Sequence, residues 1–123
     1  GMDTSKYAIQ SASSAIREKI IESSVLKIPF PSNFFDMSIC IDVLQELPEN
    51  LLPAAIREIN RVSKNSLIVV PTVNSKIKTE KDNFVCWSIS AQTAIDKKKW
   101  ENIFINSGYS SFYSFFSINL EII

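Results

Sequence analysis

Glycine occurs at only two positions of this 123-residue chain, Gly1 and Gly108. A loop that cradles a phosphate group needs several closely spaced glycines, because its backbone must adopt positive φ angles and approach the ligand closely. The sequence therefore contains neither a P-loop nor a GxGxxG dinucleotide-binding turn. Nucleotide binding that depends on such a loop is excluded within these residues.

The amino-acid composition excludes several further classes of functional site. Hydrophobic residues make up 46 % of the chain and charged residues 21 %, as in a globular protein, and the length suits one small domain. The absence of histidine excludes Ser-His and Cys-His catalytic pairs and every His-containing metal site. Thirteen basic residues balance thirteen acidic ones, so the chain lacks the basic excess of a nucleic-acid-binding protein.

The two cysteines, Cys40 and Cys86, are too few for a four-thiolate zinc site or for the disulfide framework of a small secreted domain. We expect both to be buried and reduced. No apolar run approaches the roughly 18 residues of a membrane span, and no segment resembles a signal peptide. The sequence thus predicts a cytoplasmic domain that holds no metal and contacts neither nucleic acid nor membrane.

Hydrophobic periodicity and turn residues predict an alternation of helices and strands. The first half of the chain is predicted to form a helix over residues 5–20, a short strand from Ile20 to Val25 and a strand from Phe35 to Val43. A helix over 51–64 follows, which Asn65 ends, and then a strand from Leu67 to Val70, which Pro71 ends. The last elements are a helix that Asp96 caps and a β-like segment from Ser110 to Ile123. Residues 74–83 read as a polar loop, and residues 84–95 are ambiguous between helix and strand.

The strand from Phe35 to Val43 alternates apolar residues with small ones, Ser38 and Cys40. This pattern suits a strand that is covered on both faces, as in a parallel sheet. Because such strands alternate with helices along the chain, we expect an α/β layered fold.

Several segments match one family in order along the chain. Leu26–Asp36 (LKIPFPSNFFD), Ile41–Pro48 (IDVLQELP) and Arg57–Val62 (REINRV) are similar to the "LPFPDNSFD", "DVLEHLP" and "REI-RVLKPGG" patterns of class I S-adenosylmethionine-dependent methyltransferases. Gly1–Ile9 (GMDTSKYAI) is similar to "GVDISEYAI", which closes the second strand of that fold. Trp100–Phe104, with Gly108 and Tyr109, is similar to its late helix and "AGF" turn.

The resemblance implies a fold that is incomplete. The family's first strand and its glycine-rich turn would precede Gly1. The expected fold class is therefore α/β, a truncated Rossmann-like methyltransferase sheet with flanking helices, and residues 1–123 form a single partial methyltransferase-like domain.

The resemblance also implies a set of residues that bind S-adenosylmethionine: Asp3, Thr4, Ser24, Val25, Ile41 and Asp42. Asp3 would accept hydrogen bonds from both ribose hydroxyls; otherwise it is an ordinary polar residue near the N-terminus. Ser24 would bond the exocyclic amine of adenine and Val25 would pack on the ring; otherwise they are a turn serine and a core valine.

Ile41 and Asp42 end a predicted strand, where open α/β sheets bind ligands. By resemblance this stretch faces the methyl donor and acceptor; otherwise Asp42 caps the following turn. Glu46 is a candidate base on the acceptor side, although a solvated turn residue is the simpler interpretation. The catalytic residues are unknown.

These observations predict an S-adenosylmethionine-dependent methyltransferase-like protein acting on a small molecule. The alternative is a non-catalytic, truncated remnant that serves as a dimeric binding or structural module. We expect a homodimer, because without a first strand the apolar edge of Phe35–Val43 is open, and open edges recruit another chain. Two copies would pair these strands or exchange the helix over 5–20; alternatively that helix folds over its own edge and the chain stays monomeric.

Overall fold

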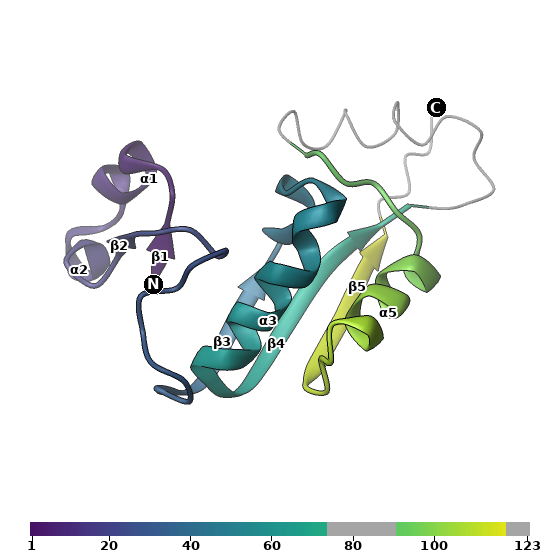
Figure 1. The fold of residues 1–123 in the computed structure, drawn as a ribbon. Helices are drawn as coiled ribbons and strands as arrows, with labels where there is room; N and C mark the ends of the chain where they lie inside the picture. The colour runs from purple at the N-terminus through teal and green to yellow at the C-terminus, as the bar shows by residue number, and fades with distance from the viewer. Residues whose placement is uncertain (74–90, 118–123) are drawn as a thin grey trace, which may run out of the picture.

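The computed structural model describes residues 1–73 and 91–117, in a mixed α/β fold (Figure 1). Its elements are β1 (Met2–Asp3), α1 (Lys6–Ser11), α2 (Ser14–Arg17), β2 (Ile21–Glu22), β3 (Phe35–Ile41), the 3₁₀ turns η1 (Leu44–Glu46) and η2 (Glu49–Leu51), α3 (Leu52–Val62), β4 (Ser63–Thr72), α5 (Lys97–Asn106) and β5 (Phe112–Ser117). In this described part, no helix is long and apolar enough to cross a membrane.

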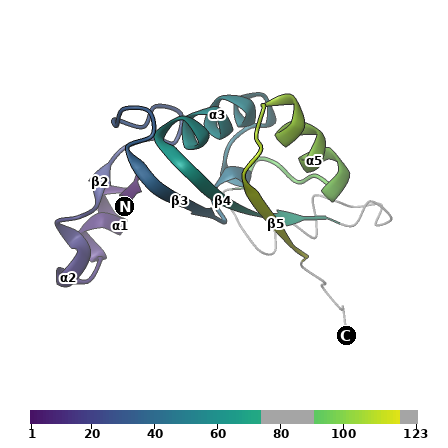
Figure 2. The same cartoon turned by 90° about the horizontal axis from the view of Figure 1, so that it is seen from below.

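The described strands form two parallel sheets. β1 pairs with β2, while β3, β4 and β5 form a second sheet in that order. In the larger sheet, Ile39 lies opposite Leu67, and Leu67 lies opposite Phe112. Helices α3 and α5 lie together on one face of this sheet (Figure 2). The predicted α/β class with parallel strands and flanking helices is confirmed.

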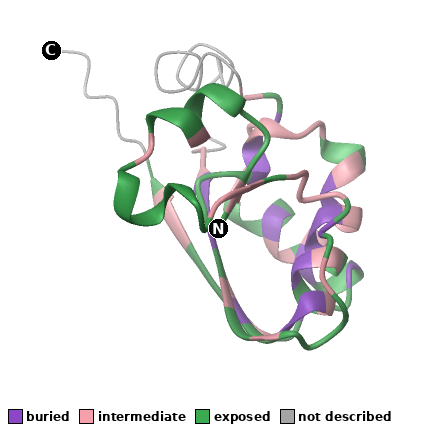
Figure 3. Ribbon diagram, turned by 90° about the vertical axis from the view of Figure 1, so that its left-hand side faces the viewer, coloured by how far each residue is buried: buried purple, intermediate pink, exposed green. Residues whose placement is uncertain are grey.

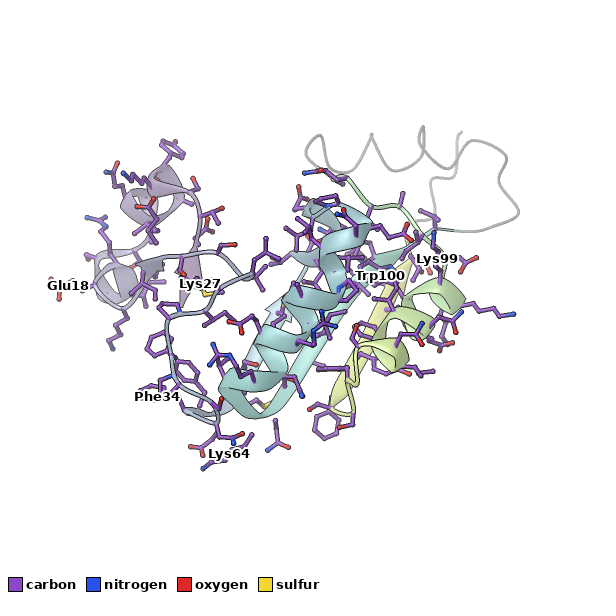
Figure 4. The ribbon with its side chains drawn as sticks, viewed as in Figure 1. Glu18, Lys27, Phe34, Lys64, Lys99 and Trp100 are labelled. Carbon is purple, nitrogen blue, oxygen red and sulfur yellow. The ribbon has the colours of Figure 1, made fainter. Side chains whose placement is uncertain are left out.

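The core lies between the larger sheet and these two helices. Helix α3 turns one apolar stripe inward, namely Leu52, Ala55, Ile56, Ile59 and Val62. Helix α5 contributes Trp100 and Phe104, both fully buried, and the indole N–H of Trp100 donates to the Pro71 carbonyl over 2.9 Å (Figure 4). Ile68 and Val70 of β4 face these helices and are also fully buried. Figure 3 shows the buried residues gathered around α3, whereas the N-terminal helices are exposed.

The predicted helix over residues 5–20 is wrong in its length. The structure has two short helices, α1 and α2, separated at Ala12 and Ser13. Serines compete for backbone hydrogen bonds and favour helix ends, and the Arg17 guanidinium caps the break by donating to the Ala12 carbonyl over 2.8 Å. Ile16 of α2 is exposed.

The expectation that β3 is covered on both faces is also wrong. Cys40 is buried beneath the helices, but Met37, Ile39 and Ile41 on the opposite face are exposed. Alternate residues of a strand point to opposite faces, so this pattern shows a sheet with one covered face.

The remaining boundaries differ less. α3 ends at Val62 and β4 begins directly at Ser63, so Asn65 lies inside a strand rather than ending the helix. Pro71 does not end that strand, which continues to Thr72. The predicted Asp96 cap is confirmed, because its carboxylate accepts from the Lys99 N–H over 2.8 Å. Most of the ambiguous region, the end of the β-like segment and Cys86 lie outside the described residues.

Burial of the Cys40 thiol is confirmed and generates a prediction about its reactivity. The side chain is 9 % exposed, and burial raises the pKa of the thiol to about 12. Since the thiolate is the reacting species, we expect a Cys86→Ser variant to react with dithionitrobenzoate about a thousandfold more slowly in the native than in the unfolded state. Absorbance followed in native buffer and in concentrated guanidinium chloride measures the two rates. Equal rates would contradict the burial.

Candidate functional site

The predicted cofactor residues lie at the carboxyl ends of parallel strands. Asp3 ends β1, and Ser24 follows β2, its direct neighbour. The Ser23 N–H donates to the Asp3 carbonyl over 3.0 Å, which joins the two strand ends. Asp42 follows β3 in the other sheet. The structure thus brings Asp3, Thr4 and Ser24 together, and in the described part of the chain no hydrogen bond links Asp42 to them.

Local hydrogen bonds orient the Asp3 carboxylate. Its Oδ1 accepts from the Ser5 N–H over 2.8 Å, and the Ser5 hydroxyl in turn caps α1 by accepting from the Ala8 N–H over 3.1 Å. Asp3 is exposed, and a carboxylate has acceptor sites on both oxygens. The arrangement can therefore accept further hydrogen bonds, such as those from two adjacent hydroxyls.

In the structure, Ser24 forms a turn and Val25 packs against the core. The Ser24 hydroxyl accepts from the Leu26 N–H over 3.2 Å, and its carbonyl accepts from the Lys27 N–H over 3.1 Å, which forms a turn. Val25 is half-buried and packs against the core. These contacts match the alternative interpretation of both residues, and their contact with a ligand stays a prediction.

Asp42 adopts a left-handed backbone conformation, with φ of +61°. Its N–H donates to the Val69 carbonyl over 3.0 Å, so the chain leaves the sheet directly after Ile41. Aspartate tolerates this conformation better than most residues, and its carboxylate Oδ1 accepts from Gln45 Nε2 over 2.6 Å. Desolvation raises the pKa of the Asp42 carboxyl and the nearby Glu46 charge adds to this, whereas the Gln45 hydrogen bond opposes it.

The sequence interpretation missed Gln45, which is fully buried at this turn. Its backbone carbonyl accepts from the N–H groups of Gln92 and Thr93, over 2.8 and 3.0 Å. Its side-chain Oε1 has no hydrogen-bond partner among the described residues. The only available signal was its position three residues after Asp42. Glu46 is half-buried in the same turn, and its role as a base stays a prediction.

A second contact connects the segment before β3 to α3. Glu58 and Arg61, three residues apart on α3, form an ion pair with 2.6 Å between Oε1 and Nε. The Arg61 guanidinium also donates to the carbonyls of Ile28 and Phe30, over 2.9 and 2.8 Å, and Glu58 accepts from the Ile28 N–H over 2.8 Å. The hydrogen bond from Arg61 lowers the pKa of the Glu58 carboxyl, and the Ile28 N–H also lowers it.

This lowered pKa predicts a pH dependence of stability. A carboxyl whose folded-state pKa lies below its unfolded value stabilises the fold above the unfolded pKa and loses that contribution as pH falls through the folded pKa. We expect Glu58→Gln to lower the free energy of unfolding at neutral pH by about 1–3 kcal/mol and to flatten the loss between about pH 5 and pH 3. Urea denaturation at several pH values measures both effects. The control is Glu101→Gln on α5, whose carboxylate lies 3.9 Å from Lys97 at the surface; equal curves for both variants would contradict the role of Glu58.

The Asp42 turn generates a separate prediction. Asp42→Ala leaves a strained left-handed residue and a buried, unpaired Gln45 amide, so we expect the free energy of unfolding to fall by about 1–3 kcal/mol. Asp42→Asn keeps an oxygen that accepts from Gln45 and tolerates positive φ, so its stability should stay near that of the wild type. Urea denaturation monitored by circular dichroism compares the two. An alanine variant as stable as the asparagine variant would contradict this account.

The chain is similar to known proteins in sequence and in fold. A family model described as a methyltransferase domain matches residues 1–70. An uncharacterized protein of Methanocaldococcus jannaschii is 38 % identical over 68 residues, which cover 53 % of this chain and 29 % of that protein. The crystal structure of the YcgJ protein from Bacillus subtilis has a TM-score of 0.66 at 20 % identity, covering 87 % of this chain and 50 % of that one.

The chain therefore spans half or less of the length of these two proteins. The likeness to YcgJ concerns the fold, and with the family match it confirms the predicted Rossmann-like methyltransferase fold. The truncation stays a prediction. Because the matched segment spans more than half of its residues, the chain belongs to the methyltransferase domain family.

Proposed function

We propose that this chain is an S-adenosylmethionine-dependent methyltransferase-like domain that acts on a small-molecule acceptor in the cytoplasm. One observation carries the proposal. The family match over residues 1–70 contains every residue that the resemblance assigns to the cofactor, and those residues lie at or shortly after the carboxyl ends of β1, β2 and β3. Ligands of open α/β sheets bind at these ends.

The described residues suit different parts of the cofactor. The exposed Asp3 carboxylate, with Thr4 beside it, would accept from the ribose hydroxyls. Ser24 and Val25 would contact the adenine edge and ring, and the turn at Ile41 and Asp42 would face the methionine part. Bound S-adenosylmethionine supplies an activated methyl group on its sulfonium. The chain then needs mainly to align donor and acceptor, so the absence of histidine is compatible with the reaction.

Because one edge of β3 is exposed among the described strands, we expect this chain alone to bind S-adenosylmethionine weakly. Among the described strands, β3 has a neighbour on one side only, β4. Ile41, which would lie against the cofactor, is 54 % exposed. A ligand at this edge would be covered on one side, and it would bury less of its surface than in the enclosed pockets that bind small molecules tightly.

We expect S-adenosylmethionine to bind more weakly than about 100 μM and to shift the backbone amide signals of Asp3, Ser24 and Asp42 in a nitrogen-15 NMR titration. Asp3→Asn should weaken binding further, because the amide keeps one acceptor oxygen and loses the charge. The matched control is Asp36→Asn at the opposite end of β3, where the carboxylate lies in an exposed pair 2.7 Å from Lys64.

Each outcome of the titration has a meaning. Affinity in the low micromolar range would contradict weak binding. Equal effects of the two asparagine variants would contradict the role of Asp3. Unchanged spectra at millimolar cofactor would contradict cofactor binding and favour the non-catalytic binding or structural module.

A further inference from the structure

The uncovered face of the β3–β4–β5 sheet is an apolar surface that the proposed function does not use. We call it the open face and define it by six apolar side chains on the side away from α3 and α5, namely Met37, Ile39, Ile41, Leu67, Val69 and Phe112. Four of them are exposed, from 49 % for Met37 to 65 % for Ile39. Exposed apolar patches of this kind mark interaction sites more often than ordinary surface.

One apolar row of the open face crosses all three strands, because Ile39, Leu67 and Phe112 lie directly opposite one another. Beside this row Ile41 lies opposite Val69, while the uncharged polar residues Asn65 and Ser114 lie opposite Met37 and Val69. None of the six side chains carries a charge. Asp36 and Lys64 form an ion pair near the start of β3 and β4, but their positions alternate with those of the open face, so their side chains belong to the other face of the sheet. Natural sheets protect exposed strands with charges, and this face has none.

The described helices of the chain do not cover this surface. Helices α3 and α5 lie on the opposite face of the sheet (Figure 2). The two N-terminal helices lie beside the small β1–β2 sheet, at the β3 side of the molecule (Figure 1). Ile39 and Ile41 stay more than half exposed with these helices in place. The N-terminal helices therefore leave the open face uncovered.

We propose that a second copy of this chain covers the open face, so that two larger sheets pack face to face. The four exposed side chains offer roughly 100 Å² each and the two half-buried ones less, so the face offers on the order of 500 Å² of apolar surface per copy. Two copies would then bury on the order of 1,000 Å² in total, which is the lower bound for a specific interface. An uncharged apolar face is complementary to itself under a two-fold axis. The chain has zero net charge, so two copies meet no long-range repulsion.

Ile39→Lys tests the proposal, because it places a charge at the centre of the open face at a position that is already exposed in one copy. Ile105→Lys on α5 is the matched control: it is the same substitution at a residue that is 69 % exposed and lies outside the open face. We expect sedimentation velocity and light scattering at tens of micromolar to give the mass of two chains for the wild type and for Ile105→Lys. Ile39→Lys should dissociate at least about tenfold more readily.

Three results would overturn the proposal: a wild-type mass of one chain at these concentrations, a dimer that Ile39→Lys leaves intact, or equal weakening by Ile105→Lys. A dimer that persists in Ile39→Lys would instead indicate pairing of β3 edges or exchange of the N-terminal helices. Circular dichroism checks that each variant is folded. If Ile39→Lys does not fold, Ile39→Thr decides in its place, because threonine keeps the β-branched shape that strands favour.

Discussion

The Glu58–Arg61 pair on α3 holds the segment at Ile28 and Phe30, through which the candidate cofactor residues of β1 and β2 connect to the larger sheet. The segment runs through Pro29, which has no N–H, and it forms no strand that would satisfy its carbonyls. The half-buried Arg61 guanidinium donates to both carbonyls, and the Glu58 carboxylate accepts from the Ile28 N–H. Charge-assisted hydrogen bonds are stronger than neutral ones, so this contact holds the segment between β2 and β3 against α3.

The turn after β3 also connects parts of the chain that lie far apart in the sequence. Asp42 leaves the sheet with positive φ, and its carboxylate holds the amide of the buried Gln45. Gln45 then supplies the carbonyl that receives the N–H groups of Gln92 and Thr93. One short turn therefore connects the end of β3 with a segment far along the chain. A ligand at Asp42 would meet a carboxyl whose pKa is raised by partial desolvation.

The layers explain why both the site and the open face exist. Two helices bury one face of the larger sheet, with Trp100 and Phe104 filling the space above β4. In the described part of the chain the other face has no such layer, although its side chains are mainly apolar, as in a buried strand. A sheet needs a covering layer on each apolar face, so the uncovered side is where an additional element or a second molecule would pack.

The sequence by itself determined the α/β class, the parallel arrangement of the main strands, the Asp96 cap and the family, because these depend on local periodicity and on motifs a few residues long. It also placed Asp3, Ser24 and Asp42 at strand ends. It could not show that residues 5–20 break into two helices, since serine competition and the Arg17 cap there outweigh the apolar spacing. Nor could it separate one-sided from two-sided burial of β3, because the same alternation fits both. The buried Gln45 and the bonds from Arg61 to Ile28 and Phe30 were decided only by the tertiary structure, since they join residues more than thirty positions apart, and such separations leave no periodic signal in the sequence.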